Sequence, residues 1–284
     1  MNYELVTVIK PNNPIWAKQK ERLKHSDGQV LSISPSPCFN RLKQIEGIKG
    51  INLLDNITKR AHIPNQFLFF NQIPTVTGSE IYMNTDRSIS IISEGEEIGS
   101  VITYAGTRRH VKEVRYINPD QSLDFIEEYS DDGSLYSNIF YYNNKVQEID
   151  FLNTQKFPVV SYYFYENVIT LIAVKNPITL EVEHKYNNLN QFVSDQLAKL
   201  VTEHDQISIS FLGIELMALE HTQSTNTLYL EESPLNEAGE IKGNLLSILT
   251  NQVQFVHKVV VNEANYAILK SKNVPLDKVV INNG

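Results

Sequence analysis

A succession of short β-rich runs in the middle of this chain restricts its fold more than any other feature of the sequence. The runs recur about every dozen residues, a spacing typical of antiparallel sheet. Ten such runs cover residues 81–84, 88–92, 98–104, 110–117, 123–129, 135–142, 146–152, 159–165, 168–174 and 180–186. Turn residues separate several of them, as at Asn118-Pro119-Asp120 and Asn143-Asn144. The connections are too short for crossover helices, so the sequence predicts one antiparallel meander.

Patterns of alternating strand and helix flank this meander on both sides. Residues 3–9 predict a buried strand, and Asn13 followed by Pro14 predicts the first residues of a helix. After residue 186 the apolar residues take the spacing of an amphipathic helix. These residues are Leu189, Phe192, Val193, Leu197, Leu200 and Val201. Further strands are predicted at 206–212, 227–230, 256–261 and 277–281, with a helix at 263–272.

These patterns predict an α/β fold in which one lobe is interrupted by an inserted sheet. We expect three parts: residues 1–75 as the first part of the lobe, 76–186 as the antiparallel β-meander, and 187–284 as the remainder of the lobe.

Charge and composition narrow the functional classes. The 284 residues carry a net charge of -8, and the longest basic cluster is Arg108-Arg109 beside His110. Nucleic acid is therefore disfavoured as a partner, because phosphate binding requires many clustered cations. The single cysteine, Cys38, excludes an internal disulfide. The N-terminus does not resemble a signal peptide, and no apolar stretch approaches the ~20 residues that span a bilayer, so we expect a cytoplasmic protein.

The sequence contains no recognisable catalytic signature. Residues 47–50 (Gly-Ile-Lys-Gly) do not have the spacing of a phosphate-binding loop, and residues 10–14 after the first strand read Lys-Pro-Asn-Asn-Pro where a glycine-rich loop would lie. No histidine pairs with another His or Cys at metal-ligand spacing. We therefore predict no catalytic residue, no cofactor and no metal.

Two features are candidates for binding a partner. The first is the aromatic run at Tyr162, Phe164 and Tyr165, near Tyr141, because aromatic rings with hydroxyl rims suit peptide or sugar recognition. Ordinary sheet packing is the alternative explanation and the more frequent one. The second is the pair Arg108 and Arg109, for which a solvated loop is the alternative to contact with an acidic partner.

Several segments resemble one family, the glycosylation chaperones of accessory Sec systems, which are the B subunits of the Gtf O-GlcNAc transferases of serine-rich repeat adhesins. Residues 69–74 (Phe-Phe-Asn-Gln-Ile-Pro) with 79–81 (Ser-Glu-Ile) are similar to the family's entry into its sheet. Residues 111–133 look like its repetitive meander, and residues 243–249 with 258–261 are similar to its later α/β part.

The resemblance implies a Rossmann-like first lobe of a GT-B architecture, interrupted by the meander and ending at a linker to a second lobe. It also implies a non-catalytic subunit that binds a catalytic O-GlcNAc transferase and a Ser/Thr-rich adhesin, in the cytoplasm, with peripheral contact at the inner face of the membrane. Two alternatives stay open. One is the acceptor-side lobe of an active retaining GT-B glycosyltransferase that uses UDP-GlcNAc or a related donor, and the other is a self-assembling sheet scaffold.

Overall fold

The computed structural model describes residues 1–282, and the chain divides into two compact units. The first unit consists of Met1–Ser34, Lys43–Leu53 and the chain from Asn190 onward. The second consists of Pro35–Leu42 and Leu54–Leu189. Each unit is built around its own sheet.

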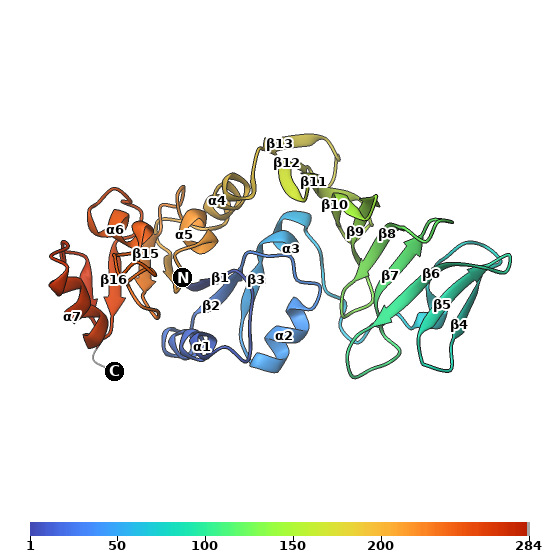
Figure 1. The fold of residues 1–284 in the computed structure, drawn as a ribbon, viewed down its shortest axis with the longest axis horizontal. Helices are drawn as coiled ribbons and strands as arrows, with labels where there is room; N and C mark the ends of the chain where they lie inside the picture. Colours follow the sequence, from blue (N-terminus) through green and yellow to red (C-terminus); the bar gives the residue numbers. More distant parts are fainter. Residues whose placement is uncertain (283–284) are drawn as a thin grey trace. The chain divides into compact units, whose positions relative to one another are not determined.

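The first unit contains a seven-stranded sheet in which every neighbouring pair is parallel. Its strands are β1 (Asn2–Val6), β2 (Gln29–Ser32), β3 (Gly50–Asn52), β14 (Gln206–Ile209), β15 (Thr225–Tyr229), β16 (Lys258–Val261) and β17 (Val279–Ile281). They lie in the order β17-β16-β15-β14-β1-β2-β3 (Figure 1). The order therefore reverses at β1, and the boundary between β1 and β14 is the topological switch point of a doubly wound fold.

The helices of the chain are short apart from α1 and α4. They are α1 (Pro14–Ser26), α2 (Phe39–Glu46), α3 (Leu53–Thr58), α4 (Leu189–Leu200), α5 (Ile214–Ala218), α6 (Gly243–Leu249) and α7 (Glu263–Ser271), with a 3-10 turn at η1 (Phe70–Gln72). The sequence correctly predicted α1, α4 and α7 but did not predict α2, α3, α5 or α6, nor the three-residue strand β3.

Helix α1 begins as its sequence predicts. The side chain of Asn13 accepts a hydrogen bond from the backbone N–H of Ile15, and Pro14 occupies the first turn, where it sacrifices no helical hydrogen bond. The helix buries Trp16, Gln19 and Leu23 on one face. The cap of the first turn is therefore formed by the residues that begin the helix.

A buried ion pair links α1 to β1, an inner strand of the parallel sheet. Glu4 of β1 is 2% exposed, and its two carboxylate oxygens accept from Arg22 Nη2 at 2.6 Å and Nε at 3.1 Å. Arg22 also donates to Glu231 at 2.9 Å and lies 4.1 Å from the ring centroid of Tyr229. An unpaired carboxylate buried this deeply would destabilise the folded state, so the Glu4 side chain depends on the guanidinium of Arg22.

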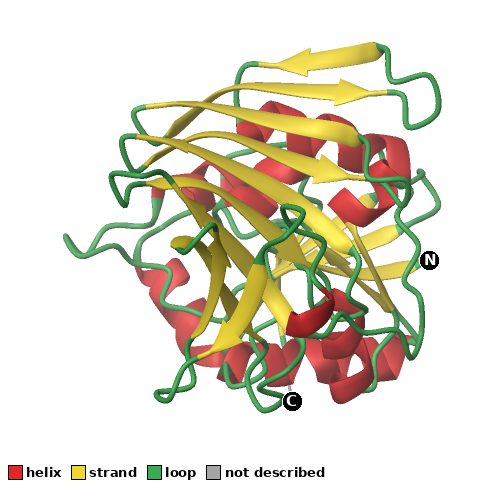
Figure 2. Ribbon diagram, turned by 90° about the vertical axis from the view of Figure 1, so that its right-hand side faces the viewer, coloured by secondary structure: helices red, strands yellow, loops and turns green. Residues whose placement is uncertain are grey.

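The second unit contains one ten-stranded antiparallel sheet in sequential order, which confirms the predicted meander. Its strands are β4 (Glu80–Met83), β5 (Ile89–Ser93), β6 (Glu96–Thr103), β7 (Val111–Ile117), β8 (Leu123–Tyr129), β9 (Leu135–Tyr142), β10 (Lys145–Leu152), β11 (Pro158–Tyr165), β12 (Val168–Lys175) and β13 (Val182–Tyr186). Figure 2 shows these strands side by side in one twisted sheet. The last strand begins two residues later than predicted, because Leu180 has a φ of 62° and its N–H closes a turn on the carbonyl of Asn176.

The β8–β9 turn is packed tightly against the segment that precedes the sheet. Arg60 donates to the carbonyl oxygens of Ser134 and Leu135, and Asp132 accepts from the N–H of Ile63. Gly133 has a φ of +76°, and a Cβ on it would lie 2.2 Å from the backbone nitrogen of Leu68. Only glycine fits this position, because both the φ and the space exclude a side chain.

Candidate functional site

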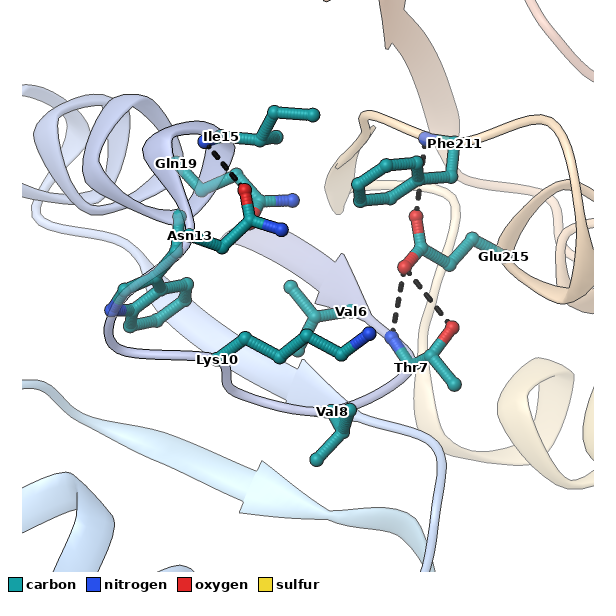
Figure 3. Close-up of a pocket in the computed structure, with 10 residues that line it drawn as sticks. Val6, Thr7, Val8, Lys10, Asn13, Ile15, Gln19, Phe211 and Glu215 are labelled. Atoms are coloured by element: carbon teal, nitrogen blue, oxygen red, sulfur yellow. Dashed lines mark hydrogen bonds between the residues drawn. The ribbon is translucent and has the colours of Figure 1, made fainter.

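A pocket of about 200 Å³ lies where β1 and β14 end, at the switch point of the parallel sheet. In open α/β sheets, ligands bind at this crevice outside the carboxyl ends of the strands. Its lining comes from the end of β1 and the loop after it, the first turns of α1, the segment after β14, and the start of α5 (Figure 3). The lining residues are Val6, Thr7, Val8, Lys10, Asn13, Ile15, Trp16, Gln19, Phe211 and Glu215.

Glu215 holds the two sides of the switch point together. One carboxylate oxygen accepts from the N–H of Thr7 at 2.8 Å and from its hydroxyl at 3.2 Å, and the other accepts from the N–H of Phe211 at 3.2 Å. The side chain is buried, and this burial raises the pKa of Glu215, while the N–H donors oppose the shift. These hydrogen bonds give Glu215 a structural task in joining the loop after β1 to the segment after β14.

The first turn of α1 faces this pocket but offers few hydrogen-bond donors to it. Pro14 has no N–H, and the N–H of Ile15 already donates to the Asn13 side chain at 2.8 Å. A helix N-terminus binds phosphate through free backbone N–H groups, and a glycine-rich loop normally allows the close approach. Here the cap and the proline occupy those positions.

A larger hollow, of about 670 Å³, lies on the α1 side of the ends of β15 and β16. Three of its charged side chains are paired with one another, because Lys18 and Arg22 both contact Glu231, at 2.6 and 2.9 Å. Glu21 lines the same hollow.

Residues 1–282 contain no group of three or more His, Cys, Asp or Glu side chains that could hold a metal ion. None of the helices in the same range is long and apolar enough to cross a bilayer. Cys38 is a free, half-buried thiol, and burial raises its pKa.

The aromatic residues predicted as a binding group lie on both faces of the sheet. Tyr162 is 5% exposed and packs edge-to-face on Phe151, with ring centroids 4.9 Å apart. Phe164 shares that face because side chains alternate along a strand, and it is half-buried. Tyr165, at the end of β11, points to the opposite face and is 69% exposed.

The structure does not bring the two arginines together with these aromatic residues. Arg108 and Arg109 are exposed in the β6–β7 turn, where Arg108 has a φ of 55° and the carbonyl of Arg109 accepts from the N–H of Phe70. Tyr141 is half-buried near the end of β9, next to the β9–β10 turn. In a meander these two turns lie at opposite ends of the strands. The six residues therefore do not form one cluster.

Sequence reasoning missed an aromatic row on the Tyr165 face of the sheet. Tyr116 of β7 stacks on Phe125 of β8 with ring centroids 4.6 Å apart, and Phe125 lies 6.1 Å from Phe140 of β9. The register pairs these residues directly across the strands. The sequence signal for this row was the two-residue period of side chains along each strand. That period shows which residues of one strand share a face, but residues of neighbouring strands can be matched only when the register is known.

No protein-family model matches the sequence, and no curated protein sequence matches it. Several solved structures match almost the whole chain. A complex of accessory secretory proteins 1, 2 and 3 from Streptococcus pneumoniae matches with a TM-score of 0.75 at 13% identity over 99% of this chain and 61% of the other. The Glycosylation Associate Protein (Gap123) complex from Streptococcus agalactiae matches with a TM-score of 0.74 at 14% identity, over 99% and 60% of the respective chains.

The third structure is the pneumococcal O-GlcNAc transferase GtfA, described in complex with UDP and GlcNAc, with a TM-score of 0.79 at 12% identity over 99% of this chain and 59% of the other. This chain has the fold of these glycosylation proteins. The predicted fold class, a Rossmann-like lobe of a GT-B architecture interrupted by a β-meander, is thereby confirmed. The chain spans about three fifths of the length of the solved chains that it matches.

Proposed function

We propose that this chain is a non-catalytic subunit of a protein O-GlcNAc transferase, which binds the catalytic subunit and a Ser/Thr-rich adhesin acceptor. The support is a fold common to a complex of accessory secretory proteins, a glycosylation-associated complex and an O-GlcNAc transferase. As part of the same proposal we place the protein in the cytoplasm, with a peripheral contact to the membrane, and keep residues 1–75, 76–186 and 187–284 as its three parts.

The main support for the non-catalytic assignment is the first turn of α1, where a proline and a side-chain cap reduce the number of free backbone N–H groups. A sugar-nucleotide diphosphate needs free N–H donors at a helix N-terminus or glycine-rich loop. Here Pro14 lacks an N–H, Asn13 takes the N–H of Ile15, and the buried carboxyl of Glu215 forms the opposite side of the pocket. The switch-point pocket therefore disfavours a diphosphate.

For the partner and the acceptor we propose the meander. A broad antiparallel sheet offers a polypeptide both strand edges and aromatic side chains. Tyr165 is exposed, and Tyr141 and Phe164 are half-buried at the same end of the strands. Arg108 and Arg109 lie at the other end, where they suit a separate contact with an acidic surface. Tyr162 is buried and would pack beside Phe164 on the same face of β11.

An active enzyme is the second candidate function. The pneumococcal O-GlcNAc transferase has the same fold with a TM-score of 0.79, so this chain also suits the acceptor-side lobe of a retaining GT-B glycosyltransferase. Titration calorimetry with UDP-GlcNAc is the measurement that can refute the non-catalytic proposal. The non-catalytic proposal expects no measurable binding by this chain, whereas tight binding would contradict it and favour the enzyme.

Co-purification tests the assembly. The tagged chain is expected to retain a glycosyltransferase from the source cell, identified by mass spectrometry, and to bind a Ser/Thr-rich repeat peptide in its presence. Substituting both Arg108 and Arg109 by Ala should weaken either the retention of the glycosyltransferase or the binding of the repeat peptide. Arg87→Ala, an exposed arginine in the β4–β5 turn, serves as the matched control. Failure to retain any glycosyltransferase would refute the proposal, and flotation with lipid vesicles tests the membrane contact.

A further inference from the structure

The switch-point pocket contains a buried hydrogen-bond donor that has no partner. Gln19 is 3% exposed and lines the pocket, yet its Nε2 forms no hydrogen bond within residues 1–282. An unsatisfied buried donor destabilises the folded state, and buried polar groups in proteins are almost always paired. An acceptor atom of a ligand in the pocket would remove this destabilisation.

A second amide is directed into the same space. Asn13 uses its Oδ1 to accept from the N–H of Ile15, and this fixes the orientation of the amide group. Figure 3 shows the Nδ2 of Asn13 and the Nε2 of Gln19 both pointing into the pocket. Lys10 adds an exposed ammonium group at the rim. The buried polar atom without a partner on this side is therefore a donor, and an acceptor atom of a ligand would satisfy it.

Apart from Thr7 and Glu215, the remaining lining is apolar. Trp16 is buried, and Phe211, Ile15 and two valines complete the lining. The volume of about 200 Å³ exceeds the ~150 Å³ of an engineered apolar cavity that binds benzene. A group of benzene size with one polar substituent therefore fits, whereas a whole nucleotide sugar would have to extend far beyond the pocket.

The charge in the pocket excludes a phosphate as the acceptor. The buried Glu215 would meet a dianion with its own carboxyl group, and Pro14 and the Asn13 cap remove two of the N–H groups that the first turn of α1 could otherwise supply. A carbonyl oxygen needs only one or two donors and carries at most a single charge. Amide and carboxylate oxygens are therefore the acceptors that match Gln19 and Asn13.

We propose that the switch-point pocket binds an apolar group of about benzene size that bears an amide or carboxylate oxygen. The oxygen accepts from Gln19 Nε2, and the apolar body lies against Trp16 and Phe211. The group belongs either to a free small molecule or to a side chain or terminus of a polypeptide. This inference goes beyond the proposed function and does not depend on it.

Trp16 makes the test direct, because it is the only tryptophan of the chain and it lines the pocket. Titration of the full chain with benzamide should give a saturable change in tryptophan fluorescence. Benzylamine, which has the same ring but only donors, should bind at least about tenfold more weakly. A short peptide that ends in phenylalanine amide distinguishes the two sources: tighter binding than benzamide indicates a polypeptide ligand, and weaker binding indicates a small molecule.

Variants of the pocket test the geometry. Gln19→Leu removes the donor at nearly constant volume and should abolish the preference for benzamide over benzylamine without lowering the unfolding midpoint. Gln206→Leu, an exposed glutamine on β14, is the matched control and should leave the preference unchanged. Val8→Phe should fill the pocket and block binding of both probes, which keeps the test valid if Gln19→Leu fails to fold.

Three results would overturn the inference. These are equal affinity for benzamide and benzylamine, an unchanged preference in Gln19→Leu, and tighter binding of UDP than of benzamide at the same pocket. The first two leave the proposed function untouched, because that proposal is decided by co-purification. The third would contradict both, and calorimetry with UDP-GlcNAc would reveal it independently.

Discussion

Removal of Arg22 should destabilise the first unit far more than removal of a neighbouring surface cation. Arg22→Met leaves the carboxylate of Glu4 in a site where it is 2% exposed, with Ser210 as its remaining hydrogen-bond donor, at 3.5 Å. Breaking a buried pair in this way costs about 3–5 kcal/mol. Lys18→Met removes a cation whose side chain is 59% exposed and which contacts Glu231 at 2.6 Å, so this control should cost about 0–1 kcal/mol.

The assay is urea unfolding at pH 8, followed by the fluorescence of Trp16, which lies in the same helix as Arg22 and reports on the first unit. The double variant Glu4→Leu with Arg22→Met should recover most of the lost stability, because apolar residues replace both charges. The reasoning is wrong if Arg22→Met and Lys18→Met differ by less than about 1 kcal/mol, or if the double variant is no more stable than Arg22→Met alone.

Further predictions concern pH, a turn and a helix cap. Burial raises the pKa of Glu4 from 4.5 to about 7, so the folded protein holds the proton of Glu4 more tightly than the unfolded chain does. The resulting contribution of Glu4 to the free energy of unfolding is complete below about pH 4.5 and is lost as the pH rises through 7. Urea unfolding at pH 5 and pH 8 should show this as roughly 3 kcal/mol at most, and Glu4→Gln should flatten the difference. Gly133→Ala should lower the thermal midpoint of the second unit by far more than Gly106→Ala, since both have positive φ but only Gly133 has backbone within 2.2 Å of the added Cβ. Equal shifts would show that the contact is unimportant. Asn13→Ala should cost the first unit about 1 kcal/mol by loss of the cap, whereas Asn12→Ala, in an exposed position, should cost nothing measurable by urea unfolding.

The meander was predictable because its information is local. Each strand pairs with the next one in sequence, and residues such as Asn143-Asn144 and Gly133 mark the turns with positive φ. The start of α1 was predictable for the same reason, since Asn13 and Pro14 act within one turn of the helix.

The short elements of the parallel lobe escaped prediction because tertiary contacts stabilise them. Helices α5 and α6 have five and seven residues and no side-chain cap, so their buried leucines carry no helical period long enough to detect. Strand β3 has three residues, and its Gly50 is close to the backbone of Val30, where an added Cβ would lie 2.7 Å from the carbonyl oxygen.

Only part of the candidate site could be predicted from the sequence. The missing glycine-rich loop at residues 10–14 was apparent, and it remains the basis of the non-catalytic proposal. Glu215 was not predictable, because it reaches Thr7 only through the pairing of β1 with β14, some 208 positions away along the chain. The helical spacing predicted that Gln19 shares a face with Trp16 and Leu23, and that face is buried in the structure. The sequence did not indicate that the Nε2 of Gln19 would lack a hydrogen-bond partner. For the aromatic run, alternation alone could not decide that Tyr165 is exposed and Tyr162 is not.

The pairing of β1 with β14 has a consequence for how the protein emerges from the ribosome. Asn2 is the register partner of Gln206, so one edge of the first strand made has no neighbour until more than two hundred residues have been translated. At about 5–20 residues per second this interval lasts on the order of 10–40 s. The ten hairpin-connected strands in between need only their immediate neighbours, and local pairing of this kind forms quickly. During synthesis, the inserted sheet should therefore be complete while the lobe that precedes it is still waiting for its central partner.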